Sequence, residues 1–368
     1  MWVGLQPDAP SELPGDTPDA DPPAAPAPVA IIMARFPTLA RRHTMHILIT
    51  GGAGFLGRKL ATALLARGSL AGADGAPRRI ERITLVDLAP AADFAGERVR
   101  SIAGDLGDAT LLDRAFVRGV DGVFHLAAVV SGEAEANFDL GWRVNVDATR
   151  ALLERCRALS TPPRVAFASS VAVFGGALPD RVPDSQALTP QSSYGAQKAV
   201  GELLVHDYAR KGFIDGRSLR LPTVTVRPGK PNKAASSFAS GIIREPLSGV
   251  EANCPVDPST RMWLVSPRTI VDSLIVGYEA PASAFPPSHS VNVPGISVTV
   301  REMVDALRRV ASAAVANLVT FRHDPVIDRI VRTWPRDFDA QVGRALGMHA
   351  DADFESIVRQ YVEHDLPR

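Results

Sequence analysis

The sequence predicts an α/β fold: a doubly wound parallel sheet with helices on both faces, and a smaller C-terminal domain whose segments interleave with the last strands. Two observations support this prediction. From His46 onward, short apolar segments typical of buried strands alternate with longer segments of helical periodicity. A glycine-rich turn joins the first strand to the first helix, as in parallel sheets that bind a ligand at their carboxyl edge.

The composition is that of an ordinary globular protein. The chain has 368 residues, 46% apolar and 22% charged, which excludes fibrous, coiled-coil and wholly disordered proteins. Its 40 basic residues balance 40 acidic ones, so charge gives no reason to expect nucleic acid or an anionic membrane as a partner. No apolar run approaches the roughly 20 residues of a membrane-spanning helix. The two cysteines, Cys156 and Cys254, lack metal-ligand spacing. We therefore expect a cytoplasmic protein without a metal site.

Residues 1–44 differ from the rest of the chain. The stretch Asp8–Pro28 is mostly Pro, Ala and Asp, so it buries too little apolar surface to offset the entropy lost on ordering. Met45 stands directly before the first strand. We expect residues 1–44 to be a disordered or non-native extension and the folded protein to start at Met45.

A glycine-rich turn connects the first strand to the first helix. His46–Thr50 is a short apolar strand, and the helix that follows the turn continues to about Arg67. Gly51 permits a tight turn, Gly54 lets the backbone approach a pyrophosphate, and Gly57 allows close packing of helix on strand. The pyrophosphate would lie at the positive, amide-rich end of the helix. The turn thus predicts a dinucleotide site with contacts at Gly51, Gly54, Phe55, Leu56 and Gly57.

The second strand, Arg82–Val86, leads to Asp87. A carboxylate at this strand end can accept hydrogen bonds from both ribose hydroxyls of an adenosine, and it would repel a 2′-phosphate. Leu88 follows, and no arginine stands next to Asp87 to neutralise such a phosphate. This favours NAD over NADP as the cofactor.

Two further strands, Val99–Ala103 and Gly122–Ala128, continue the sheet. Asp105 follows the first of them, and two roles are open for it: a bond to the adenine amino group or a cap on the helix beginning near Asp108. His125 lies inside the second strand and is expected to be a core residue. We predict cofactor contacts at Asp105, Leu106 and Ala127.

A candidate catalytic group follows the fifth strand. Arg164–Ala168 delivers Ser169 and Ser170 to the carboxyl edge of the sheet, and a helix beginning near Gln191 carries Tyr194 and Lys198. The i, i+4 spacing places both side chains on one face. A phenol with a pKa of about 10 is a poor base at neutral pH, but an adjacent ammonium lowers that pKa. We therefore predict Tyr194 as a general base supported by Lys198.

These motifs together resemble the extended short-chain dehydrogenase/reductase superfamily over residues 45–365. The resemblance implies a Rossmann-type sheet, NAD as cofactor, and a homodimer formed through the helix near Glu133 and the Tyr194 helix. In that family a serine stands five residues before a Tyr/Phe-Gly glycine, here Gly175, so the resemblance implies Ser170 rather than Ser169 as the catalytic serine. It also implies that Asn145 supports the lysine through a water. The catalytic residues implied are Ser170, Tyr194, Lys198 and Asn145.

Three C-terminal segments are more specific. Residues 227–247, Ser259–Trp263 and Trp334–Arg336 resemble the D-erythronate dehydrogenase branch of the superfamily. That branch oxidises the C2 hydroxyl of a four-carbon sugar acid with NAD. A nucleotide-sugar epimerase or dehydrogenase is the alternative. A sugar dehydratase is disfavoured, because Val171 and Ala172 stand where that group carries an Asp-Glu pair.

A sugar acid needs a cationic or amide-rich clamp for its carboxylate. The candidates are Lys230, Asn232, Lys233, Arg244, Arg261 and Arg268, with Asn232 and Arg261 first because they lie within the distinctive segments. Substrate hydroxyls are expected to meet Ser131, Ser237, Ser170 and Tyr194. We expect an NAD-binding domain at 45–228 and a substrate-binding region at 229–368. Predicted helices in this region are 234–243, 268–278, 300–310, 338–346 and 353–363, and predicted strands are 262–266 and 290–293.

Overall fold

The computed structural model describes residues 44–72, 74–94, 96–229 and 235–367. The predicted extension at 1–44 lies outside these ranges, except for Thr44, with which the first strand begins. The described residues form one compact unit. The predicted boundary between residues 228 and 229 stays a prediction.

The main sheet confirms the predicted doubly wound parallel architecture. From β1 the chain adds β3 and then β4 on one side, and β5, β6, β7 and β11 in turn on the other, all parallel. The short strand β2 (Ser69–Ala71) pairs antiparallel with the start of β3. The winding direction therefore reverses at β1 and β5, where such sheets leave a crevice at their carboxyl edge. The strands are β1 Thr44–Thr50, β3 Pro77–Asp87, β4 Val99–Ala103, β5 Gly122–His125, β6 Arg164–Ser170, β7 Asp215–Leu221 and β11 Ser290–Asn292.

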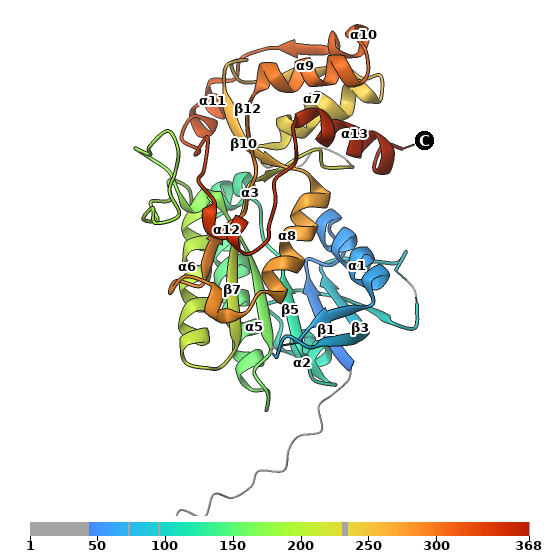
Figure 1. Cartoon of the computed structure of the whole chain (residues 1–368), viewed down its shortest axis with the longest axis vertical. Coiled ribbons are helices and arrows are strands. Elements are labelled where there is room, and N and C mark those ends of the chain that lie inside the picture. The colour runs from blue at the N-terminus through green and yellow to red at the C-terminus, as the bar shows by residue number, and fades with distance from the viewer. Residues whose placement is uncertain (1–43, 73, 95, 230–234, 368) are drawn as a thin grey trace, which may run out of the picture. The chain divides into compact units, whose positions relative to one another are not determined.

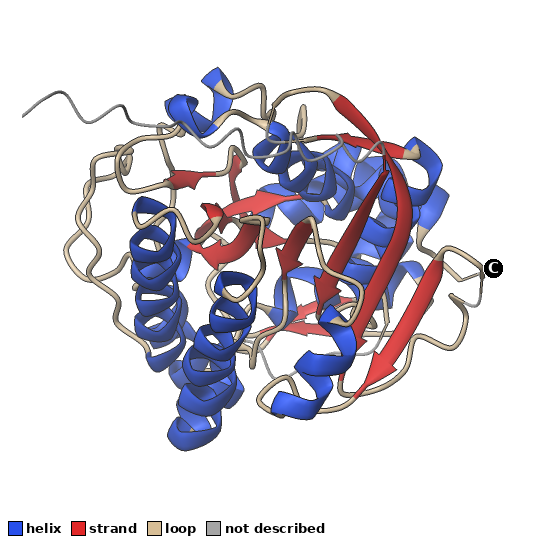
Figure 2. Cartoon of the chain, turned by 90° about the horizontal axis from the view of Figure 1, so that it is seen from below, coloured by secondary structure: helices blue, strands red, loops and turns tan. Residues whose placement is uncertain are grey.

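Helices cover both faces of this sheet (Figure 2). Along β1, Ile47 and Ile49 face one apolar core and Leu48 faces the other, as strand alternation requires. The first core contains residues of α1 (Phe55–Arg67) and α8 (Pro267–Glu279). The second contains residues of three helices: α2 Ala109–Phe116, α5 Ala148–Arg157 and α6 Ser193–Arg210. Within the described ranges no helix is both long and apolar enough to cross a membrane.

The C-terminal elements build a third core of their own. Figure 1 shows α7, α9, α10 and α13 grouped at the end of this unit opposite α2 and α5. β11 leaves this group and pairs with β7 in the main sheet. The elements are helices α7 Ser237–Leu247, α9 Val300–Val310, α10 Ala313–Ala316, α11 Pro325–Val331, α12 Gln341–Ala345 and α13 Phe354–His364; a sheet of β8 Thr223–Val224, β10 Arg261–Val265 and β12 Ile296–Thr299; and the pair β9 Ala252–Cys254 and β13 Val319–Phe321.

Some predicted boundaries are corrected by side chains that bind the backbone. The strand predicted to reach Ala128 ends at His125. Beyond it, the Asn145 side chain accepts from the Val129 amide and donates to the Val129 carbonyl, so it replaces a neighbouring strand. The helix predicted near Gln191 begins at Ser193, because the Ser192 hydroxyl caps it. The predicted strand 262–266 is β10, which spans Arg261–Val265 and lies in the three-stranded sheet.

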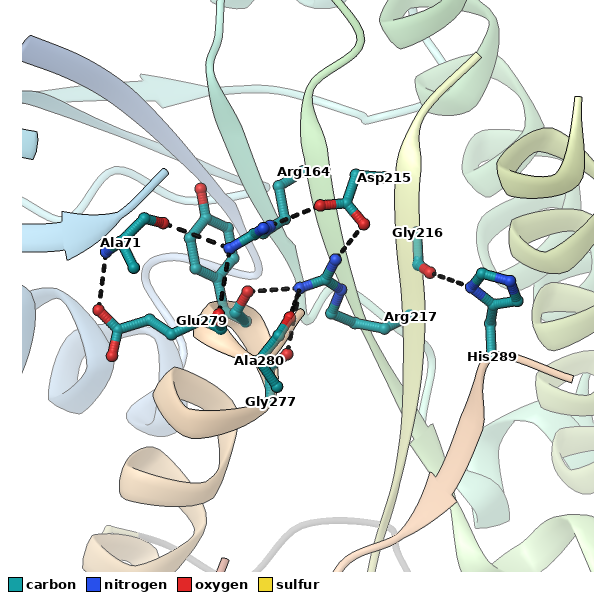
Figure 3. Close-up of polar contacts among 10 residues, drawn as sticks. Ala71, Arg164, Asp215, Gly216, Arg217, Gly277, Glu279, Ala280 and His289 are labelled. Carbon is teal, nitrogen blue, oxygen red and sulfur yellow. Dashed lines mark hydrogen bonds and ion pairs between the residues drawn. The ribbon is translucent and has the colours of Figure 1, made fainter. Parts of the chain in front are cut away.

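A buried arginine cluster closes the amino edge of the sheet (Figure 3). The Asp215 carboxylate at the start of β7 accepts from Arg164 at 2.7 Å and also pairs with Arg217. Arg217 is fully buried. Its guanidinium donates to backbone carbonyls at the end of α8, which satisfies acceptors that a helix leaves free. Those carbonyls belong to Gly277, Tyr278 and Ala280. The cluster therefore ties β6, β7 and α8 together.

Removing the acid from this cluster should destabilise the fold. Asp215→Asn leaves Arg164 and Arg217 without their buried counter-charge, so we expect a loss of about 3 kcal/mol in the free energy of unfolding. Urea denaturation at pH 7 measures it. Burial alone raises the pKa of Asp215, but the charges of Arg217 and Arg164 outweigh it and hold the pKa below its usual value. The contribution is thus present at neutral pH and is lost as the pH falls through that lowered pKa.

The matched control is Asp207→Asn, which breaks the Asp207–Arg210 ion pair on the exposed side of α6. Exposed pairs contribute about 0–1 kcal/mol. Equal losses in the two variants would contradict the role assigned to the cluster.

Candidate active site

The glycine-rich turn between β1 and α1 is packed so closely that side chains on two of its glycines would collide with the backbone. Gly51 has a φ of +69°, and a Cβ on it would lie 2.8 Å from the amide nitrogen of Ala127. A Cβ on Gly57 would overlap the carbonyl oxygen of Gly51. Gly54 is exposed and is the N-cap residue of α1, with no side-chain cap. The turn therefore keeps its backbone free of side chains and ends at an exposed helix N-terminus, which fits the pyrophosphate of a dinucleotide.

Asp87 lies directly over this turn. Its Oδ2 accepts from the amides of Ala53 at 3.0 Å and Gly54 at 3.2 Å, and its Oδ1 accepts from Leu88 at 2.7 Å. The carboxylate is thus fixed at the end of β3, beside the start of α1. This is the place that the predicted ribose contact requires.

Asp105 does not cap the helix that follows it, so that alternative is wrong. Helix α2 begins at Ala109, and its cap is the Asp108 side chain, which accepts from the Thr110 amide at 2.8 Å. The Asp105 carboxylate instead accepts from Gly107 and pairs with Arg143. The Gly107 hydrogen bond, followed by the Arg143 contact, lowers the pKa of Asp105.

The remaining predicted cofactor residues lie around the same edge of the sheet. Phe55 and Leu56 are the first residues of α1. The Ala127 amide donates to the Thr50 hydroxyl at 3.2 Å. Leu106 is buried in the core on the α2 face. The roles of these residues in cofactor binding stay predictions.

Ser170, Tyr194 and Lys198 lie together. Ser170 ends β6, and its side chain hydrogen-bonds with Tyr194, the second residue of α6. Lys198 is 2% exposed, and its Nζ donates to the carbonyl of Ala168 at 2.8 Å. The Nζ lies 5.7 Å from the centroid of the Tyr194 ring. A serine hydroxyl, a phenol and an amine thus converge beyond the carboxyl edge of the sheet.

The pKa of Tyr194 differs from the expectation. Burial raises the pKa of this phenol to about 12, and the Ser170 hydrogen bond and the Arg227 charge only partly oppose it. The net shift is thus opposite to the expected lowering, and the contribution of Lys198 stays a prediction. Burial also lowers the pKa of Lys198 to about 7, with the charge of Glu202 opposing it. Lys198 is therefore only partly charged near neutral pH and supports the phenol less than a fully protonated ammonium would.

Asn145 contacts the residue that precedes Lys198, the lysine that it was predicted to support. It stands in a π-helical turn, Arg143–Asp147, and its Nδ2 donates to Oε1 of Gln197 at 2.7 Å. Gln197 precedes Lys198 in α6. The support of Lys198 through a water stays a prediction.

The predicted substrate contacts are more scattered. Ser131 begins helix α3 (Ser131–Ala136) and Ser237 begins α7. Asn232 lies outside the described residues. Arg261 is exposed, and its Nη1 donates to the carbonyl of Ser297 at 3.0 Å and lies 3.9 Å from Glu302. These contacts of Arg261 are with β12 and α9 rather than with the Tyr194 helix.

Two charged residues near the site were missed by sequence reasoning. Arg227 acts on Tyr194 through its charge, and its guanidinium donates to the Ser236 hydroxyl at 3.1 Å. Glu202 lies one helical turn beyond Lys198 and is 3% exposed. The signal for Glu202 was its i+4 spacing from Lys198 on a buried helix face. No local pattern links Arg227 to Tyr194.

The glycine turn gives a direct test of the cofactor site. Gly57→Ala places a methyl group against the Gly51 carbonyl, so the turn must open and we expect NADH affinity to fall at least about tenfold, equivalent to 1.4 kcal/mol. NADH fluorescence titration measures this. Gly96→Ala is the control, because a Cβ there meets nothing within 4 Å. If both variants bind NADH like the wild type, the turn is not the pyrophosphate site.

The sequence comparisons agree with one another. The model of the NAD dependent epimerase/dehydratase family matches residues 47–261. The chain is 57% identical over 319 residues to a D-erythronate dehydrogenase of Cupriavidus necator, covering 87% of this chain and 98% of the relative. It is 45% identical over 323 residues to a D-erythronate dehydrogenase of Haemophilus influenzae, covering 88% of this chain and 100% of the relative.

Two solved structures share the fold over most of their length. A nucleoside-diphosphate-sugar epimerase from Agrobacterium tumefaciens has a TM-score of 0.81 and 44% identity, covering 88% of this chain and 95% of that one. A GalE-like L-threonine dehydrogenase from Cupriavidus necator has a TM-score of 0.73 and 25% identity, covering 86% of this chain and 99% of that one.

Proposed function

This chain belongs to the NAD dependent epimerase/dehydratase family, and from that membership we propose that it oxidises the C2 hydroxyl of D-erythronate with NAD. The membership confirms the predicted superfamily, the NAD cofactor and the oxidoreductase class. The observation that carries the reaction is the convergence of Ser170, Tyr194 and Lys198 beside the glycine turn. The substrate follows from the two relatives named D-erythronate dehydrogenase.

The residues of this chain divide the reaction between them. The Ser170 hydroxyl binds the C2 oxygen of the acid, and Tyr194, as the phenolate, accepts the hydroxyl proton. A bound NAD would supply the acceptor for the hydride that leaves the same carbon. Lys198 and Arg227 place positive charge near the phenol, which favours its ionised form. The turn at Gly51, Gly54 and Gly57 holds the pyrophosphate, and Asp87 holds the adenosine ribose.

The substrate carboxylate needs a cation, and we assign it to Arg227. Two other candidates already have partners: Arg244 pairs with Glu245 at 2.5 Å, and Arg261 contacts Ser297 and Glu302. Arg227 is half-buried, is held by Ser236, and acts on Tyr194 through its charge. An arginine beside the base would bind the acid end of a short substrate and hold its C2 hydroxyl near the phenol.

We also propose that the protein is cytoplasmic and forms a homodimer through α6 and the helices near Glu133. Two apolar side chains on these elements support the dimer: Leu203 on α6 is 62% exposed, and Phe138 on α4 (Phe138–Trp142) is 56% exposed. In the proposed dimer the partner chain would cover both of these side chains.

The proposed reaction predicts NADH formation from D-erythronate. Purified protein should reduce NAD with D-erythronate, and much more slowly with L-erythronate, D-threonate or L-threonate, followed at 340 nm. NADP should be a poor cofactor, because Asp87 repels a 2′-phosphate. NAD that stays tightly bound, with no net NADH from any of these acids, would favour the alternative, a nucleotide-sugar epimerase.

Tyr194→Phe is the control for this assay. It removes only the hydroxyl that accepts the proton, so turnover should fall at least 100-fold while NADH still binds. Wild-type turnover by this variant would rule out Tyr194 as the base.

Arg227 and Arg261 can be compared directly, since both lie in the segments typical of the branch. Losing a charge-assisted carboxylate contact costs about 1.5–3 kcal/mol. We therefore expect Arg227→Gln to lower kcat/KM for D-erythronate about 10- to 100-fold, mostly through KM, with NADH affinity unchanged. Arg261→Gln should change it less than about threefold. The reverse result would indicate that Arg261, not Arg227, binds the substrate carboxylate.

A further inference from the structure

Helix α6 and the end of β6 meet in a ladder of three contacts. Tyr194, Lys198 and Glu202 are spaced four residues apart, so they lie along one side of the helix. Tyr194 hydrogen-bonds with Ser170, Lys198 with the carbonyl of Ala168, and Glu202 with the hydroxyl of Ser169. Three successive residues at the end of β6 are therefore each bound by α6. The proposed mechanism gives roles to Ser170, Tyr194 and Lys198 and leaves the Glu202 contact unexplained.

The Glu202 carboxylate is buried and rigidly held. Its Oε1 accepts from Ser169 at 2.5 Å and from Arg220 Nε at 2.9 Å, and its Oε2 accepts from Arg220 Nη2 at 2.7 Å. The Arg220 guanidinium lies over the ring of Phe174, 5.0 Å from its centroid. Burying a bidentate ion pair costs desolvation energy, which only good hydrogen-bond geometry offsets. The position of this pair beside Lys198 therefore needs an explanation.

The charged and titratable groups around Lys198 come from its own helix and from two strands. On α6 they are Tyr194 and Glu202, on β5 His125, and on β7 Arg220 acting through Glu202. Burial and the charge of Lys198 lower the pKa of His125 to about 3, so His125 stays neutral. Tyr194 is neutral at pH 7 as well. Among these groups, Glu202 is the negative charge that opposes the desolvation of Lys198.

We propose that Glu202 is a positioning residue: clamped by Arg220 and Ser169, its carboxylate favours the ammonium form of Lys198 and holds α6 in register with Ser170. Without this charge, burial would shift Lys198 further toward the neutral amine, and the positive charge beside the Tyr194 phenol would be weaker. The consequence for turnover rests on the proposed function. The protonation of Lys198 does not, so it can be measured without a substrate.

The test is the titration of Lys198 by NMR in protein labelled with ¹³C-lysine. The chain has five lysines, and the spectrum of Lys198→Arg assigns the Cε signal of Lys198. In Glu202→Gln we expect the Lys198 midpoint to fall by about one pH unit or more, and in Glu202→Asp, which keeps the charge, to stay closer to the wild type. An unchanged midpoint in Glu202→Gln would overturn the proposal.

Two further variants separate this effect from a general loss of stability. Asp215→Asn removes a partly buried acid between two arginines at the opposite edge of the sheet, and it should leave the Lys198 midpoint unchanged (Figure 3). If Glu202→Gln does not fold, the double variant Glu202→Gln/Arg220→Met removes both charges and should still lower the midpoint. A wild-type midpoint there, or a fall in Asp215→Asn equal to that in Glu202→Gln, would overturn the proposal.

Turnover then gives a separate readout. If D-erythronate is the substrate, the acid limb of the kcat profile should move to higher pH in Glu202→Gln, with KM nearly unchanged. If the wild type does not turn over D-erythronate, the proposed substrate fails, and the NMR titration still decides the role of Glu202.

Discussion

The register between helix α6 and strand β6 is the constraint on which the site depends. Three consecutive residues of β6, at 168–170, each contact a different turn of α6. Because strand side chains alternate in direction, a shift of one residue would turn Ser170 away from Tyr194. The Glu202–Arg220 pair and the amine of Lys198 hold this register from within the protein. The catalytic geometry is thus a consequence of how one helix packs on one strand.

An acid–arginine ion pair lies at each edge of the main sheet, and the two pairs have different roles. At the amino edge, Asp215 holds two arginines that close the end of α8 (Figure 3). At the carboxyl edge, Glu202 holds Arg220 beside the lysine of the site. Glu202 is buried and Asp215 is partly buried, and arginine side chains donate to the oxygens of both acids. The Glu202 pair lies beside Tyr194 and Lys198, the residues proposed to carry the reaction.

Much of the fold was predictable because it rests on local patterns. Helix α9 has the predicted bounds, since its apolar spacing and its Thr299 capping box are both local. Strand β5 was predicted three residues too long. Beyond its end the backbone at Val129 is bound by Asn145, which lies 16 residues later in the chain, so no local pattern marks this end. The separate sheet of β8, β10 and β12 was missed for the same reason: which strands pair depends on distant segments.

The sequence by itself determined the glycine turn, the spacing of Tyr194 and Lys198, and the position of Ser170 at a strand end. These features follow from backbone sterics and helical periodicity, which act over a few residues. Only the tertiary structure decided the charge states at the site. Tyr194 and Arg227 lie 33 residues apart in the chain, and Glu202 and Arg220 lie 18 apart, yet folding brings each pair together. Burial and charge depend on such neighbours, and no local pattern of residues records them.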